Sequence, residues 1–88
     1  MNRPHLIAAE IQYTGEHAVV VPENSSAQVL VINYVAAEIL SKCDGIATID
    51  TIADHIAMKF GVDRGRVRND VIQLVEAVRE IGLMRHGE

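Results

Sequence analysis

The stretch VLVINYVAAEIL, residues 29–40, decides the fold of this chain because its apolar residues change their period in the middle. Before Asn33 the chain carries a run of β-branched and aliphatic residues, which is typical of a strand. After Asn33, apolar side chains recur at helical spacing at Tyr34, Ala37 and Leu40. Asn33 is itself a favoured helix N-cap, so the sequence predicts that a strand ends and a helix begins there. We expect this helix to end near Gly45.

Upstream of this stretch, the sequence predicts further antiparallel strands. Residues 10–13 form a short candidate strand, residues 14–16 a turn, and residues 17–21 a β-branched run. Residues 22–26 suit a turn and oppose a strand ladder. The apolar run of residues 27–32 follows directly, and two β-rich runs joined in this way are typical of an antiparallel hairpin.

Downstream, two more helices are expected. Thr48 is the predicted N-cap of the second helix, which Gly61 ends. Asp63 is the predicted N-cap of the third and longest helix, and Gly82 closes it, with the next two residues folding back onto it. The expected core line of the third helix is Val67, Val71, Leu74, Val78 and Ile81.

The chain has 88 residues, of which 49% are hydrophobic and 23% charged. This length and composition favour a single globular domain over residues 1–88, with its core at about residues 10–84. Two or three antiparallel strands followed by three helices predict an α+β fold similar to a small winged helix-turn-helix domain.

Several function classes are excluded or disfavoured by composition. No apolar run approaches the ~20 residues of a transmembrane helix, and residues 1–5 do not lead into a signal peptide, so we expect a soluble, cytoplasmic protein. The lone Cys43 fits a reducing compartment. The formal net charge of −4 argues against bulk affinity for nucleic acid.

No constellation of catalytic or metal-binding residues is found. The four histidines, at positions 5, 17, 55 and 86, are scattered and lack metal-ligand spacing. Cys43 is next to Asp44 near a predicted helix C-terminus, which disfavours a thiolate, so we interpret it as a buried small residue. No phosphate-binding glycine motif occurs. The sequence therefore predicts a protein that is not an enzyme and needs no cofactor or metal.

The third predicted helix opens with Arg64, Arg66 and Arg68, in the turn where the helix dipole favours acids. Ion pairs with Asp63, Asp70 or acids of the second helix are one explanation. An anionic partner, either nucleic acid or an acidic peptide, is the other.

A second line on that helix also needs an explanation. Arg68, Ile72, Val75 and Arg79 lie at i, i+4, i+7 and i+11, beside the expected core line. The two aliphatic residues either widen the buried face or line a groove. If the run of residues 27–32 is the outer strand of the sheet, its uncharged edge is the kind of site to which an extended peptide adds as a strand.

The chain resembles the PqqD family over about residues 10–84. The matching elements are VPE at 21–23, VIN at 31–33, AAEIL at 36–40, CDG at 43–45, Thr48, IA at 52–53, FG at 60–61, DV at 70–71 and GL at 82–83. One departure is the connection of residues 22–28, which is longer than in many members and has no glycine.

The resemblance implies a winged-helix-like domain that binds the leader of a ribosomally made precursor peptide and presents it to a modifying enzyme, often a radical S-adenosylmethionine enzyme. In the family, the leader adds as a strand and lies along the third helix. Carried onto this chain, the resemblance implies a peptide-binding set of Val29, Leu30, Val31, Ile32, Arg68, Ile72, Val75 and Arg79.

Two other functions stay open. In a winged-helix transcription factor, the third helix would enter a major groove and use Arg64, Arg66, Arg68 and Asn69. The net charge and the acids on the same helix oppose this alternative. In a structural role, the open strand would pair with a second copy, so both a monomer and a homodimer are compatible with the sequence.

Overall fold

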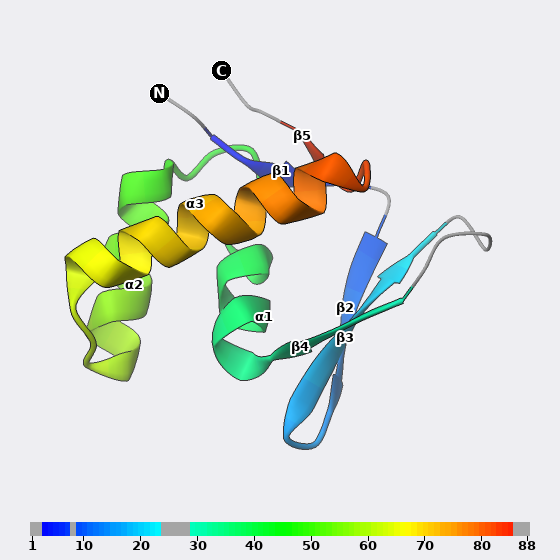
Figure 1. The fold of residues 1–88 in the computed structure, drawn as a ribbon, viewed down its shortest axis with the longest axis horizontal. Helices are drawn as coiled ribbons and strands as arrows, with labels where there is room; N and C mark the ends of the chain where they lie inside the picture. The colour runs from blue at the N-terminus through cyan, green and yellow to red at the C-terminus, as the bar shows by residue number, and fades with distance from the viewer. Residues whose placement is uncertain (1–2, 8, 24–28, 86–88) are drawn as a thin grey trace.

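A computed structural model describes residues 3–7, 9–23 and 29–85 of the chain. Strands come first and three helices follow, as the sequence predicts (Figure 1). The elements are β1 (His5–Leu6), β2 (Ala9–Thr14), β3 (His17–Pro22), β4 (Leu30–Asn33), α1 (Tyr34–Ser41), α2 (Ile49–Phe60), α3 (Arg64–Glu80) and β5 (Met84–Arg85). The α+β class is confirmed.

The main sheet is antiparallel, with strand order β2-β3-β4. Its inner face packs on the core through the fully buried Ala18 and Val20, together with the partly buried Leu30 and Ile32. Val31 points the other way and is 70% exposed, as the two-residue period of a strand requires. Within the described residues only β3 pairs with β4, so β4 is an outer strand of the main sheet. Of the predicted outer run, residues 27–28 lie outside the described residues.

Side-chain caps fix where the helices begin. The backbone N–H of Ala36 donates to Asn33 Oδ1 at 2.8 Å, at the start of α1. Thr48 caps α2 and Asp63 caps α3 in the same way, at 3.1 and 3.0 Å. Gly61 ends α2 in the left-handed conformation, with φ of 64°. These four predicted cap residues are confirmed. The predicted end of the first helix near Gly45 was wrong, because α1 ends at Ser41 with Lys42 as its C-cap.

The buried face of α3 differs from the predicted core line. The buried residues are Val67, Val71, Val75 and Val78. Leu74 is half-buried and packs against the core, whereas Ile81 is 51% exposed, so the prediction was wrong for Ile81. The buried seam therefore has four valines at i, i+4, i+8 and i+11.

A second, two-stranded sheet was not predicted. β1 pairs with β5 in antiparallel register, His5 opposite Arg85 and Leu6 opposite Met84 (Figure 1). The fold-back after α3 is confirmed, because the N–H of Leu83 donates to the Val78 carbonyl at 3.2 Å and residues 83 and 84 are buried. None of the described helices combines the length and the apolarity needed to cross a membrane.

Candidate functional site

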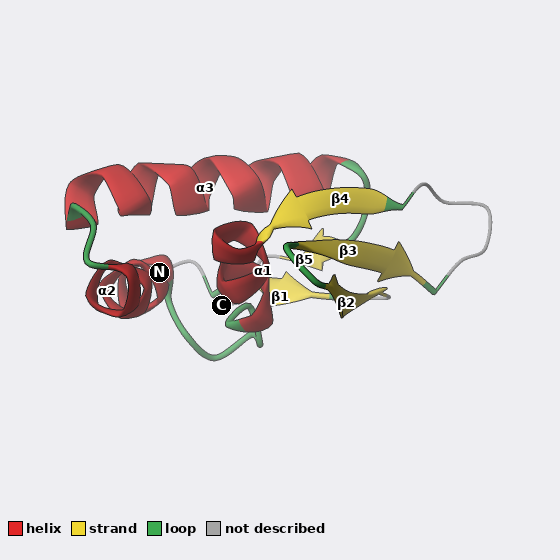
Figure 2. Cartoon of the chain, turned by 90° about the horizontal axis from the view of Figure 1, so that it is seen from below, coloured by secondary structure: helices red, strands yellow, loops and turns green. Residues whose placement is uncertain are grey.

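The outer strand β4 and the longest helix α3 lie on the same side of the molecule in the view of Figure 2. Figure 2 shows β4 as the strand of the main sheet nearest to α3, with β3 on its other side. The unpaired backbone edge of β4 therefore faces toward the helix. An unpaired, uncharged strand edge can accept a further strand through main-chain hydrogen bonds.

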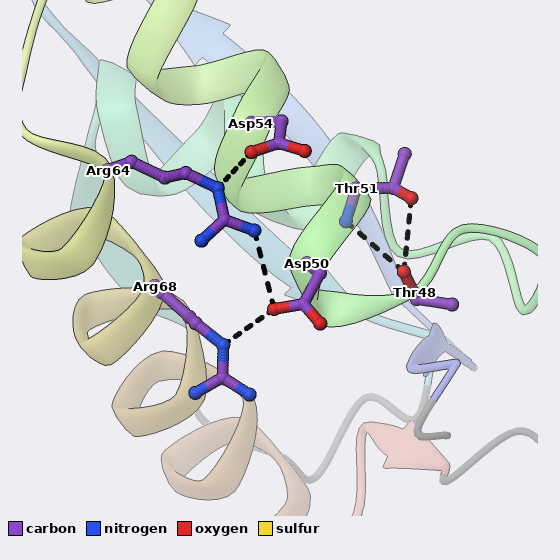
Figure 3. A network of polar contacts seen from close by, with 6 residues as sticks. All are labelled: Thr48, Asp50, Thr51, Asp54, Arg64 and Arg68. Carbon is purple, nitrogen blue, oxygen red and sulfur yellow. Dashed lines mark hydrogen bonds and ion pairs between the residues drawn. The ribbon is translucent and has the colours of Figure 1, made fainter.

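One side of α3 is bound to α2 by ion pairs (Figure 3). Arg68 Nε donates to Asp50 Oδ1 at 2.6 Å, and Arg64 Nη2 lies 3.6 Å from the same oxygen. The Nε of Arg64 also pairs with Asp54. The hydrogen bond from Arg68 lowers the pKa of Asp50, and the bond to Asp54 raises the pKa of Arg64. We call this side, which carries Arg64 and Arg68, the α2 flank of α3.

These contacts explain two of the three arginines at the start of α3. Arg64 and Arg68 have acidic partners on α2, so ion pairing within the domain is the correct interpretation for both. Arg66 differs: within the described part of the chain it makes no ion pair, and its side chain lies at the opposite flank.

The predicted stripe on α3 is not brought together with β4. Arg68 is engaged with Asp50, and Arg79 Nη2 lies 3.7 Å from Glu76 on its own helix. Ile72 is half-buried and packs on the core, whereas Val75 is 1% exposed and belongs to the core itself. At 3.6 residues per turn, Ile72 and Arg79 follow the α2 flank rather than the side toward β4. Of the two alternatives that the sequence left open, Val75 therefore fits the wider buried face and not the lining of a groove.

The opposite flank of α3 lies on the side of β4. Near its start, it forms a cleft of about 290 Å³ with the first turn of α1 and the end of α2. The walls of the cleft are Val35, Phe60, Val62 and Val67, and its polar residues are Asp63, Arg66 and Asp70. Val35 comes two residues after Asn33, the last residue of β4, so the cleft lies near the end of that strand.

The same side continues along the helix. Asp70, Leu74, Ala77 and Ile81 lie at i, i+4, i+7 and i+11. Leu74 is half-buried and the other three are exposed. We call this line the β4 flank, and the β4 flank together with the free edge of β4 the β4 surface. Of the predicted strand residues, Leu30, Val31 and Ile32 belong to β4, whereas Val29 precedes it and is 54% exposed.

The β4 flank is not apparent from the sequence, because Leu74 and Ile81 also fit the helical spacing of the expected core line. The one signal in the sequence that distinguishes the buried seam of α3 from the β4 flank is the residue type. The buried seam consists of valines alone, whereas the β4 flank mixes Asp70 and Ala77 with larger aliphatic residues.

Cys43 is a packing residue, as predicted. Its side chain is 3% exposed, and burial, with a smaller effect from Asp44, raises the pKa of its thiol to about 12. A thiol with this pKa is almost entirely protonated at neutral pH and is a poor nucleophile.

Together these features define a class: a small winged-helix-like α+β domain whose accessible feature is a strand edge beside its last helix. Comparison with known families is more specific. The family model described as "Coenzyme PQQ synthesis protein D (PqqD)" matches residues 16–84, and the chain belongs to this PqqD family. The resemblance read from the sequence is confirmed.

Curated relatives agree with this assignment. Proteins named PqqA binding protein from Rhodopseudomonas palustris strains BisB5 and HaA2 are 32% and 33% identical over 57 residues. The match covers 65% of this chain and 56% of each relative, so the chain spans about half the length of the curated relatives.

A solved structure supports the fold. TbiB1, in a complex with the TbiA(beta) leader peptide, superposes with a TM-score of 0.76 and covers 92% of this chain and 94% of its own. At 18% sequence identity, this likeness concerns the fold alone.

Proposed function

We propose that this domain binds the leader segment of a ribosomally made precursor peptide by adding it as a further strand to β4. The observation that carries the proposal is that β3 alone pairs with β4 among the described residues, which leaves the other edge of β4 free on the α3 side of the main sheet (Figure 2). Main-chain hydrogen bonds to β4 would hold an extended peptide, and alternate side chains of the peptide would contact Leu74, Ala77 and Ile81.

Family membership supports the same partner. The relatives from R. palustris are named for binding PqqA, and TbiB1 was solved with a leader peptide. By this likeness, the partner of our chain is a precursor peptide of the same general kind. The domain is then a binding protein and not a catalyst, which agrees with the absence of any catalytic motif from the sequence.

The bound leader would be delivered to a modifying enzyme, such as a radical S-adenosylmethionine enzyme. Holding the leader beside the enzyme makes the encounter between substrate and active site effectively intramolecular. The gain comes from effective concentration and requires no catalytic group in this domain.

The DNA-binding alternative gains no support. A winged-helix reader needs its arginines for phosphates and bases, yet Arg64 and Arg68 are held by Asp50 and Asp54. The family match and the relatives named above favour a peptide partner.

A display library of leader segments from bacterial precursor peptides, PqqA sequences included, tests the proposal. Peptides enriched on the wild-type chain are then measured by calorimetry against two variants. Ala77→Glu adds a large charged side chain to the β4 flank, and we expect it to weaken binding about tenfold or more. Asn69→Glu adds the same charge at an exposed position outside that flank and is the matched control.

Both substitutions introduce a good helix former at an exposed helical position, so both variants should unfold like the wild type. The proposal is wrong if no leader segment is enriched, or if the two variants bind the selected peptides equally well. Sedimentation of the same samples shows whether the binding species is a monomer or a dimer.

A further inference from the structure

The cleft of about 290 Å³ between α1, α2 and α3 lies at the end of β4 and is not part of the strand edge itself. The last residue of β4, Asn33, caps α1, and the second residue of that helix, Val35, already lines the cleft. A peptide that runs along β4 therefore reaches the cleft when it passes the end of the strand.

The direction of the peptide follows from the sheet. All described pairs in the main sheet are antiparallel, and an added strand that keeps this pattern runs opposite to β4. Its N-terminal part then lies beside Asn33 and its C-terminal part beside Leu30. The peptide residues that reach the cleft are those on the N-terminal side of the strand-forming segment.

The size and chemistry of the cleft indicate what it can hold. Pockets for small molecules and cofactors run from about 300 to 1,000 Å³, so this cleft is at the lower limit and suits one side chain. Its apolar walls include three half-exposed residues, Val35, Phe60 and Val62, which are 38%, 38% and 47% exposed. These side chains would lose water on contact with an apolar partner.

The polar residues of the cleft fit a peptide better than a lone hydrocarbon. Arg66 offers donors and Asp70 offers acceptors at the same opening, and neither makes an ion pair within the described residues. A peptide backbone that enters such a site presents both carbonyl oxygens and N–H groups.

We infer that the cleft is an anchor site for one large apolar side chain, aromatic or branched aliphatic, of the bound peptide, located N-terminal to the segment that pairs with β4. This inference rests on the proposed function and adds to it a selectivity rule. The strand edge accepts many extended sequences because it reads the main chain, whereas the cleft fixes the polarity and register of the peptide.

The substitution Val35→Glu tests the anchor site. It places a carboxylate in the apolar wall, and an acidic residue in the first turn of α1 is favourable to the helix dipole, so the fold should be retained. Met58→Glu is the matched control, because it makes the same apolar-to-acid change on α2 at a residue that is 86% exposed and does not line the cleft. Val62→Glu, in the connection between α2 and α3, is a second cleft variant.

The probes are a peptide selected from the leader library on the wild-type chain and its alanine variant, in which the large apolar residue preceding the strand segment is replaced. We expect the alanine peptide to bind the wild type about tenfold more weakly. Val35→Glu should bind the parent peptide more weakly by a similar factor. It should bind both peptides with equal affinity, because the change in the domain and the change in the peptide remove the same contact.

Each outcome has a distinct meaning. If the peptides bind, Ala77→Glu weakens them and both cleft variants bind as the wild type does, the anchor site is wrong while the proposed function stands. If no leader segment binds at all, the proposed function itself is wrong. If Met58→Glu weakens binding as much as Val35→Glu, the effect is one of net charge and the anchor site is also wrong.

Discussion

Val75 shows how much a single residue decides in this domain. It is 1% exposed in the buried seam of α3, whereas Ile81, six residues later on the same segment, is 51% exposed. The two side chains have similar apolarity, so the chemistry of the residues does not distinguish them. Their different positions around the helix axis explain the difference in exposure.

The substitution Val75→Asp should therefore unfold the domain rather than affect binding alone. An unpaired carboxylate in this core costs several kcal/mol, about 3 or more, against a total stability of roughly 5–15 kcal/mol for a small domain. Ile81→Asp should change the free energy of unfolding by only about 0.5 kcal/mol, as surface substitutions usually do. Urea denaturation of both variants measures the difference, and equal stabilities would contradict the placement of Val75.

Among the elements, the contact between α1 and α2 depends on one carboxylate. Glu38 on α1 lies 3.1 Å from Lys59 Nζ and 3.1 Å from His55 Nε2, both on α2, and 4.0 Å from Lys42 Nζ. Its side chain is 19% exposed, and no other described carboxylate has three basic partners. The hydrogen bond from Lys59, followed by that from His55, lowers the pKa of Glu38 below its ordinary value of 4.5.

This lowered pKa gives stability a dependence on acid pH. A carboxyl whose pKa is lower in the folded state stabilises the fold at pH values above its unfolded pKa, and this contribution is lost as the pH falls through the folded pKa. We expect the melting temperature of Glu38→Gln to fall less steeply than that of the wild type below about pH 4.5. Glu76→Gln, which removes an exposed carboxylate of an i, i+3 pair, is the control. If the melting temperatures of the wild type and Glu38→Gln fall equally steeply below about pH 4.5, Glu38 makes no such contribution.

The elements also show which features a sequence can reveal. The caps Asn33, Thr48 and Asp63 were predictable because each acts on backbone N–H groups within its own helix turn. The hairpin of β3 and β4 was predictable from two β-rich runs joined by a turn, whereas the outer position of β4 comes from the strand order in the structure. The caps and the hairpin depend only on residues that are close in the sequence, so the sequence is sufficient to predict them.

What could not be predicted is non-local. The phase of α3 depends on what packs against it, because apolar residues lie on both the buried seam and the β4 flank. The pairing of His5–Leu6 with Met84–Arg85 joins two-residue strands from opposite ends of the sequence, and strands this short have no periodicity to detect. Both features depend on contacts between residues that are far apart in the sequence.

At the scale of the whole molecule, the formal net charge of −4 conceals an uneven distribution. Arg64 and Arg68 are neutralised by acids of α2, whereas Arg66 lies at the cleft. The arginines at the start of α3 therefore serve two purposes: two hold the helices together, and one is available beside the β4 surface.

The buried thiol provides a measure of the opening of the whole fold. Cys43 packs in the core, and its thiol has a pKa of about 12. We expect it to resist iodoacetamide at neutral pH in the folded protein and to react when the chain unfolds, so that labelling across a urea series follows the loss of structure. Mass spectrometry counts the modified fraction. Labelling in buffer as fast as in high urea would show that the thiol is accessible without unfolding.

The pairing of β1 with β5 has a consequence for how this domain can be combined with other proteins. Because the strands at residues 5–6 and 84–85 lie side by side, the polypeptide enters and leaves the fold at one place (Figure 1). The domain could thus be inserted into a loop of a larger enzyme, or circularly permuted, with little rearrangement. If the domain were joined to another protein near β1 and β5, the edge of β4, which belongs to the other sheet, would stay accessible to a peptide.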